Sequence, residues 1–199
     1  VVPQLTVDAV TPTQTICIGG SADEFEVTYT GGTGNPSYQW FSTNSNTNTD
    51  GTKITGETNS TYMPAAFSTT GSFYFYAEIY SDGNGCNLAK SDVFQVDVLT
   101  DPVIDTQAIA SQELCQNATP TDLTVAVSGG TTSDKTYQWF QNTANNTTRG
   151  TAIAGAISNT YKPSTATVGS VYYYLVVSQS ESGCSVVSDV SVVKINEAP

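Results

Sequence analysis

The sequence contains no histidine, one methionine and only six lysine or arginine residues among its 199 positions. Histidine is the side chain that most often moves protons near neutral pH, so acid–base catalysis without it would need carboxylates with tuned pKa values. The aspartates and glutamates are scattered, and the sequence has neither a nucleophilic G-x-S-x-G motif nor a phosphate-binding glycine loop. These absences predict that the protein is not an enzyme.

Positive charge and long apolar segments are equally scarce. Six basic residues stand against 18 acidic ones, which gives a net charge of −12 at pH 7. Nucleic acids and anionic lipid surfaces attract basic patches, so an acidic chain is a poor match for both. No apolar run approaches the roughly 20 residues that a membrane-spanning helix needs. We therefore expect no nucleic-acid partner and no insertion into a membrane.

What the sequence does contain is a repeat that covers nearly its whole length. The tetrapeptide YQWF occurs at residues 38–41 and again, 99 positions later, at residues 137–140. The segments around it align as well, for example GSFYFY with GSVYYY. Self-similarity at a period of about 100 residues indicates two copies of one fold, each long enough to bury its own core. We predict two domains, residues 1–100 and residues 101–199.

The two repeats end alike, because VFQVDVLTDP and VSVVKINEAP both run from alternating apolar residues into a proline. A further unit could follow the second repeat, and the chain opens without a methionine or a charged and apolar leader. We therefore expect a piece of a longer tandem array. A mature two-domain protein is the alternative.

Each repeat carries one pair of cysteines at equivalent positions. Cys17 and Cys86 are 69 residues apart, and so are Cys115 and Cys184. Paired cysteines at such regular spacing are typical of an oxidising compartment. Of the three possible connectivities, the equal spacing favours disulfides between Cys17 and Cys86 and between Cys115 and Cys184. Buried free thiols are the alternative, and zinc is disfavoured because no cysteine has a close Cys or His neighbour.

Apolar and β-branched residues alternate over four to eight positions between clusters of Gly, Asn, Asp and Ser, which is the pattern of β-strands. The first repeat has predicted strands at residues 4–10, 24–30, 37–42, 72–80 and 92–99, with weaker ones near Lys53 and Thr61. The second has them at residues 103–108, 123–128, 135–141, 170–178 and 189–195. This pattern predicts an all-β protein of two tandem immunoglobulin-like antiparallel β-sandwich domains. Trp40 and Trp139, on the third strand of each repeat, are the expected core anchors.

Several short motifs recur in the same order in both repeats: TICIGGS and ELCQNAT, then YQWF, then TYMP and TYKP, then GSFYFY and GSVYYY, then GNGC and ESGC. Together they resemble the Ig-like repeats of very large secreted cell-surface proteins of the Bacteroidetes, including gliding-motility adhesins. The resemblance implies secretion and display on the cell surface. One departure from antibody-type domains is the place of the cysteines. In each repeat they precede the predicted second strand (residues 24–30 and 123–128) and follow the aromatic strand (residues 72–80 and 170–178), instead of lying inside those strands.

Tyrosines on the aromatic strand are candidate ligand-binding residues, since carbohydrate-binding sandwiches often stack sugars on exposed rings. If the residues alternating with them face the core, Tyr74 and Tyr76 face outward, as do Tyr172 and Tyr174. Ordinary packing on a sheet face is the alternative. The polar loops at residues 43–50 and 142–149 are the other places where such a fold would carry binding residues.

Three aspartates lie where the two repeats meet, at Asp97, Asp101 and Asp105. Carboxylate oxygens are the ligands that Ca²⁺ prefers, so these residues are a candidate calcium site that would stiffen the joint. They match no known calcium-binding loop, and solvated linker carboxylates are the alternative.

Together these features predict a structural and interaction segment of a large extracellular, cell-surface adhesin. It would act as a rigid spacer and as an adhesion surface. The expected partners are neighbouring repeats of the same chain, surface glycans and other cells. The alternatives are a carbohydrate-binding or accessory module of a secreted polysaccharide-active protein, and a calcium-stiffened filament subunit.

Overall fold

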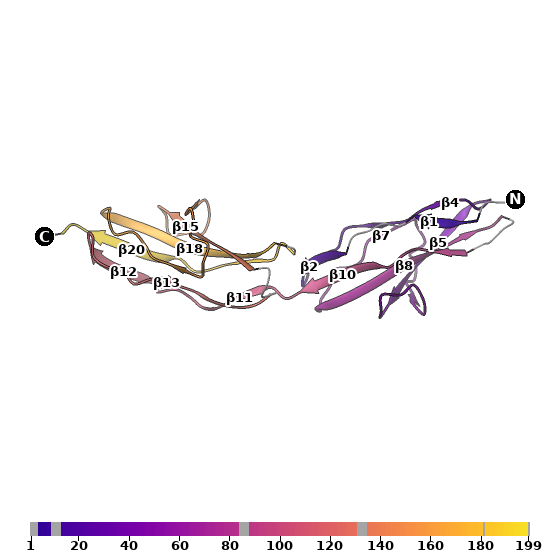
Figure 1. The fold of residues 1–199 in the computed structure, drawn as a ribbon, viewed down its shortest axis with the longest axis horizontal. Helices are drawn as coiled ribbons and strands as arrows, with labels where there is room; N and C mark the ends of the chain where they lie inside the picture. The colour runs from indigo at the N-terminus through magenta and orange to yellow at the C-terminus, as the bar shows by residue number, and fades with distance from the viewer. Residues whose placement is uncertain (1–3, 9–12, 84–87, 131–134, 181, 199) are drawn as a thin grey trace. The chain divides into compact units, whose positions relative to one another are not determined.

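The structure is a computed structural model of residues 1–199, and it describes all of them except residues 1–3, 9–12, 84–87, 131–134, 181 and 199. The chain divides into two compact units, Val1–Leu99 and Thr100–Pro199, called unit 1 and unit 2 below. In the described part of the chain every regular element is a β-strand (Figure 1), and no helix there is long and apolar enough to span a membrane. The prediction of two all-β sandwich domains is confirmed.

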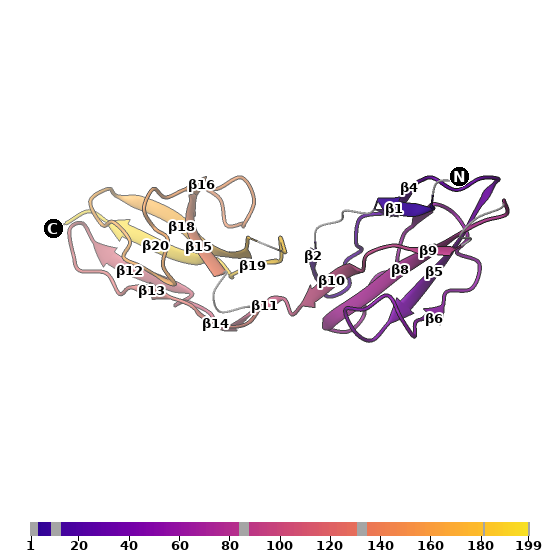
Figure 2. The same cartoon turned by 45° about the vertical axis from the view of Figure 1, so that its right-hand side comes forward.

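Unit 1 has two layers of strands (Figures 1 and 2). The larger sheet has the order β2 (Gln14–Cys17), β10 (Phe94–Leu99), β8 (Gly71–Ser81), β5 (Pro36–Thr43) and β6 (Thr52–Lys53). Strand β10 pairs with the first part of β8, and β9 (Leu88–Lys90) pairs with its last part. The facing layer consists of two short antiparallel pairs, β1 (Thr6–Asp8) with β4 (Thr28–Thr30) and β3 (Phe25–Glu26) with β7 (Thr61–Tyr62).

Unit 2 repeats this arrangement strand for strand. Its larger sheet has the order β12 (Ser111–Cys115), β20 (Ser191–Asn196), β18 (Gly169–Gln179), β15 (Lys135–Asn142) and β16 (Thr151–Ala152), with β19 (Ser185–Val187) also paired with β18. The facing pairs are β11 (Pro102–Thr106) with β14 (Ala126–Gly129) and β13 (Leu123–Thr124) with β17 (Thr160–Tyr161).

Alternation of apolar residues explains the long strands. In β10 the side chains of Phe94, Val96 and Val98 are buried while those between them are half-buried, as expected for one face turned to the core. The sequence did not predict the short strands β2, β9, β12 and β19. Strand β2, for example, has four half-buried residues and no alternation, because it is an edge strand that pairs with β10 in parallel.

A tryptophan lies at the centre of each core. Trp40 and Trp139 are 0% exposed, and each indole Nε1 donates a hydrogen bond to a backbone carbonyl, that of Asn59 at 3.0 Å or that of Ser158 at 2.9 Å. The indole is therefore buried without leaving its N–H group unpaired. In unit 1 the ring of Phe25 packs on Trp40 with the ring centroids 6.1 Å apart, and it joins the β3 layer to the larger sheet.

Two further side chains hold the strands in the same way in both units. The amide Nε2 of Gln39 donates to the carbonyls of Trp40 and Ile54, at 2.9 and 2.8 Å, and Gln138 makes the equivalent bonds in unit 2. The hydroxyl of buried Ser91 accepts a hydrogen bond from the Ala77 amide at 2.9 Å, as Ser188 does from Leu175 at 2.8 Å. These bonds satisfy backbone groups at places where strands depart from regular pairing. The strands concerned are β5, β8 and β9 and their counterparts in unit 2.

Candidate functional site

The tyrosines of β8 and β18 do not form an open platform. Tyr76 and Tyr174 are only 2% and 4% exposed, so the expectation that these two rings face solvent is wrong. Each ring stacks on a phenylalanine of the neighbouring strand, Phe41 or Phe140, with ring centroids 5.1 Å apart. Each hydroxyl also accepts a hydrogen bond from a glycine amide of the following loop at 3.2 Å. The loop that follows β5 or β15 therefore covers the outer face of the aromatic strand.

Tyr74 and Tyr172 lie two residues before Tyr76 and Tyr174 on the same strands, and both are half-buried. Their backbone partners across the sheet are Thr43 and Asn142, the last residues of β5 and β15. These two tyrosines are thus the partly accessible members of the predicted set, and each lies near the end of its sandwich.

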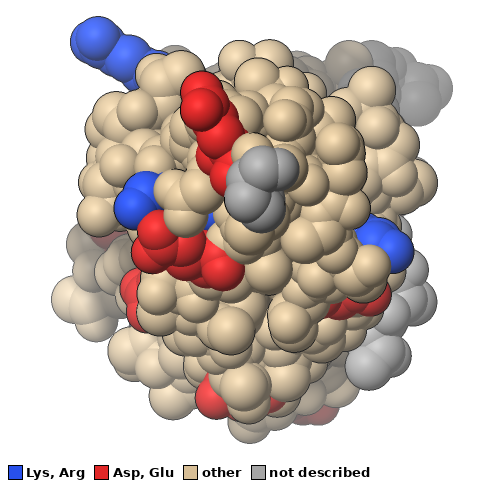
Figure 3. All heavy atoms as spheres, turned by 90° about the vertical axis from the view of Figure 1, so that its left-hand side faces the viewer, with Lys and Arg blue, Asp and Glu red and all other residues tan. Residues whose placement is uncertain are grey.

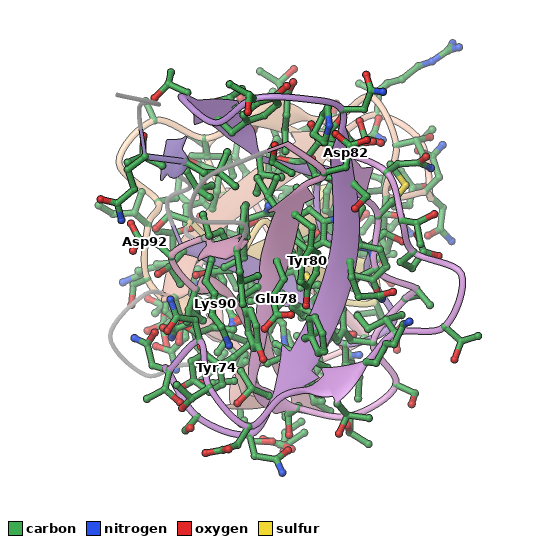
Figure 4. The ribbon with its side chains drawn as sticks, turned by 90° about the vertical axis from the view of Figure 1, so that its right-hand side faces the viewer. Tyr74, Glu78, Tyr80, Asp82, Lys90 and Asp92 are labelled. Carbon is green, nitrogen blue, oxygen red and sulfur yellow. The ribbon has the colours of Figure 1, made fainter. Side chains whose placement is uncertain are left out.

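The outer face of β8 and β9 in unit 1 carries a cluster of polar and aromatic side chains (Figure 4). Lys90 Nζ forms an ion pair with Glu78 at 2.8 Å and lies 5.3 Å from the centroid of the Tyr76 ring. The Tyr80 hydroxyl donates to Glu78 at 2.6 Å. Tyr80 and its cross-strand partner Leu88 are 41% and 44% exposed, so an apolar patch borders the ion pair.

The cluster fixes the charge of its carboxylate. Burial by itself would raise the pKa of Glu78, but hydrogen bonds from Lys90 and Tyr80 and the attraction of the ammonium outweigh it and lower that pKa. The same hydrogen bond to Glu78 raises the pKa of Lys90 and that of Tyr80. Glu78 is therefore an ion-paired carboxylate at neutral pH, which cannot serve as a general acid.

Among the described residues of unit 2, no such cluster lies at the equivalent place. The residues opposite each other there are Val176 and Val187, where unit 1 has Glu78 and Lys90. The strand pattern gave no reason to single out Glu78 or Lys90. Their absence from the aligned second repeat was the signal that could have identified them.

The cysteines differ from the predicted pairing. Cys115 is a free, exposed cysteine, whereas Cys17 and Cys184 are each disulfide-bonded. Of the predicted pair Cys17–Cys86, Cys86 lies outside the described residues. The predicted pair Cys115–Cys184 is wrong.

The topology of unit 2 explains why this pair does not form. Cys115 pairs in register with Asn196, at the end of the sheet where β18 begins at Gly169. Cys184 accepts a backbone hydrogen bond from Gln179, at the other end of β18. Ten residues of strand separate the two ends by about 33 Å, while a disulfide needs Cα atoms within about 7 Å.

The aspartates proposed as calcium ligands have hydrogen-bond partners of their own. Asp97 accepts from the Ser72 hydroxyl at 2.6 Å and from the Gln95 amide at 3.0 Å. Asp105 accepts from the Ser128 hydroxyl at 2.7 Å. Asp101 is exposed. Within either unit taken alone, the described Asp, Glu and Cys side chains do not gather in groups of three that could hold a metal ion.

Charge is spread thinly over the surface. On the face that Figure 3 shows, acidic and basic side chains are scattered among uncharged ones. The second ion pair, between Lys194 and Glu113 at 2.7 Å, joins side chains that are both more than half exposed, and such pairs contribute little to stability.

Comparison with known proteins agrees with this architecture. Residues 7–100 and 105–197 each match a family described as a domain of unknown function, DUF8696, and the chain belongs to that family as two consecutive copies. No curated protein matches the chain.

Among solved structures, a fragment of titin, I67–I69, is similar with a TM-score of 0.52 and 15% identity, over 98% of this chain and 64% of that one. Domains 3–5 of Drosophila OTK are similar with a TM-score of 0.57 and 12% identity, over 98% and 60%. The three N-terminal domains of the outer capsid protein Hoc of bacteriophage RB49 are similar with a TM-score of 0.55 and 14% identity, over 98% of this chain and 71% of that one. The chain thus spans less than two thirds of the titin and OTK fragments, and the likeness establishes a tandem Ig-like fold.

Proposed function

We propose that this chain is a spacer segment of a large extracellular adhesin, in which the two Ig-like units hold a binding surface away from the cell. The single observation that supports the proposal best is the duplicated frame of buried side chains. Both units place the same tryptophan, glutamine, serine and tyrosine at the same contacts. Repeats that keep the same internal contacts while their outer faces vary fold alike, as expected for the units of a tandem spacer.

The setting outside the cell is part of the same proposal. Disulfide-bonded Cys17 and Cys184 favour an oxidising compartment, because cytosolic thiols are kept reduced. Tandem Ig-like sandwiches are common in cell-surface and structural proteins. Display on a bacterial surface and a role in gliding motility rest on the sequence motifs alone.

A catalytic role has less support. The chain has no histidine, and Glu78, a buried carboxylate, is held in its charged form by Lys90. A glycan-binding platform of exposed tyrosines, the alternative function, has lost support because Tyr76 and Tyr174 are buried.

Single-molecule force spectroscopy tests the spacer proposal. The chain is held between two handle domains with reductant present, so that only the folded sandwiches resist extension. We expect two separate force peaks, each releasing about 30 nm of chain as about 95 residues extend. The variant Trp40→Ala serves as the control, because it should weaken one peak and leave the other. Extension without resolved peaks would contradict the spacer role.

A further inference from the structure

A hollow lies at one end of unit 2, beside the loop that joins β15 to β16. Its volume is about 280 Å³, and it is lined by Gln141, Asn142, Thr143, Arg149, Thr151 and Val171. The lining combines one guanidinium group with amides and hydroxyls, and Val171 supplies an apolar surface. Pockets for small ligands have this composition: a few polar groups that fix orientation beside an apolar wall.

The loop over the hollow is held in one shape by its own hydrogen bonds. Asn142 Nδ2 donates to the carbonyl of Thr148 at 2.9 Å and to Oδ1 of Asn146 at 2.9 Å. Asn146 Oδ1 also accepts from the Thr148 amide at 3.0 Å. A loop fixed in this way loses little conformational entropy when a ligand binds, which favours binding.

The corresponding end of unit 1 has larger side chains at two equivalent positions. At the position of Val171 it has Phe73, whose ring packs on that of Phe67 with centroids 4.7 Å apart. At the position of Phe67, unit 2 has Thr165, since Phe67 and Thr165 accept equivalent hydrogen bonds from the amides of Gly19 and Asn117. Unit 2 therefore has smaller side chains where unit 1 has two aromatic rings.

The rim of the hollow carries the chain's one arginine. Arg149 has a φ of 61°, and the equivalent residue of unit 1, Asp50, has a φ of 56°, so both occupy the same left-handed backbone position before a glycine. Among the described residues Arg149 forms no ion pair. Arg149 is therefore an exposed positive charge in a chain whose net charge is −12.

We propose that this hollow binds one residue of an acidic oligosaccharide, a uronic-acid sugar. The planar guanidinium of Arg149 matches a carboxylate with two parallel hydrogen bonds. Gln141, Thr143 and Thr151 supply donors and acceptors for sugar hydroxyls, and Val171 packs against an apolar face of the ring. A volume near the lower limit of ligand pockets fits a single sugar.

This inference adds a ligand to the proposed spacer role and does not depend on it. Force spectroscopy reads the folding of the sandwiches, whereas the hollow concerns one end of unit 2. Failure of either proposal leaves the result for the other unchanged.

Isothermal titration of the full chain with trigalacturonate tests the proposal, with the fully methyl-esterified trisaccharide as the neutral counterpart. We expect the acidic sugar to bind and the ester to bind at least about tenfold more weakly, because the charged hydrogen bonds are lost. Arg149→Asp should weaken binding of the acid by about tenfold or more, and it keeps the fold because unit 1 has aspartate in this backbone position. Equal binding of acid and ester, or no binding of either, would overturn the proposal.

Two further variants locate the site. Val171→Phe copies the residue of unit 1 into the hollow and should abolish binding while Arg149 stays in place. Lys53→Asp, an exposed change in unit 1, alters the net charge by the same amount as Arg149→Asp and should leave affinity within about twofold. Binding that survives Val171→Phe, or that falls equally with Lys53→Asp, would show that the sugar is not held in the hollow.

Discussion

Unit 1 and unit 2 fix their central strands with the same side chains but surround them with different chemistry. In unit 1 the ring of Phe25 contacts four other aromatic rings, those of Trp40, Tyr62, Phe75 and Phe94. In unit 2 the position of Phe25 is taken by Leu123, and the cross-strand pair Phe75–Phe94 becomes Tyr173–Ser191. The core of unit 2 is therefore less aromatic and more polar at the same depth.

On the outer face of the larger sheet the difference is reversed, because there unit 1 is the more polar of the two. Unit 1 has the ion pair Glu78–Lys90 there, while unit 2 has Val176 and Val187. The hydrogen bonds made by the tryptophan, the glutamine and the serine are the same in both. The comparison shows which contacts define the repeat, because those that hold the backbone are kept while packing partners are exchanged.

The largest effect on stability should come from removing the core tryptophan that both units share. Trp40→Ala and Trp139→Ala should each lower the free energy of unfolding of their own unit by about 3–5 kcal/mol, since each deletes a fully buried indole and leaves a cavity. Hydrogen-exchange mass spectrometry in increasing urea reads the two units separately. A loss below about 1 kcal/mol in either unit would mean that its tryptophan is not the anchor of the core.

The ion pair is the next largest difference. Lys90→Val should destabilise unit 1 by about 1–3 kcal/mol, because it leaves the buried carboxylate of Glu78 without its ion-pair partner. Glu78→Val should cost less, because the Lys90 that it leaves behind is exposed to solvent. The double variant recreates the valine pair of unit 2 and should recover most of that loss. Urea unfolding of the three variants gives the coupling free energy.

Two observations control for that result. Lys194→Ala breaks the exposed pair with Glu113 and is expected to change stability little. The pKa of Glu78 is lowered from its ordinary 4.5, so its contribution is present above pH 4.5 and is lost as the pH falls through the folded-state value. Unit 1 should thus lose more stability in acid than it does in the double variant. A double variant as unstable as Lys90→Val would contradict the explanation.

Sequence patterns predicted the fold because burial follows alternation in the long strands. Phe75, Ala77 and Ile79 face the core of unit 1 as expected. The same alternation predicted Tyr76 to be exposed, and it failed because a strand pattern contains no information about a loop that folds back over the outer face. The short edge strands β2 and β12 were missed for a similar reason, since their pairing with β10 and β20 depends on the tertiary fold.

The sites were harder to predict than the fold. Equal spacing of the cysteines indicated that Cys17 and Cys115 are equivalent, as their register shows. It could not show that Cys115 and Cys184 lie beside opposite ends of β18. The loop at residues 142–149 was recognised as a place for binding residues. The exchange of Asp50 for Arg149 and of Phe73 for Val171, visible in the aligned repeats, was the signal that would have located the hollow.

A smaller difference concerns the phenol in the core of unit 2. Burial, with a contribution from Tyr161, raises the pKa of Tyr173 to about 12. Above pH 10 the unfolded chain therefore loses the Tyr173 proton while the folded chain keeps it. The stabilisation is complete below pH 10 and is lost as the pH rises through 12. Between pH 9 and 11, unit 2 should lose about 1 kcal/mol more than it does in the variant Tyr173→Phe.

The control for this prediction uses the other unit. Phe75→Tyr places a phenol at the equivalent position of unit 1 and should give that unit the same alkaline loss. Thermal or urea midpoints at pH 9 and pH 11 measure both variants. Equal alkaline slopes for the wild-type chain and Tyr173→Phe would show that the phenol is not the group that titrates.

The smallest expected effect on stability concerns two cysteines at equivalent strand ends, of which one is disulfide-bonded and the other is free. Cys17 pairs in register with Leu99 and is disulfide-bonded, whereas Cys115 pairs with Asn196 and is free and exposed. A maleimide should label Cys115 in the native chain and leave Cys17 and Cys184 unlabelled until reductant is added, as peptide mapping by mass spectrometry would show. Because Cys115 is exposed, labelling it should shift the unfolding free energy by less than about 0.5 kcal/mol. Protection of Cys115 from the reagent would mean that its sulfur is engaged, and the correction to the predicted pairing would then fail.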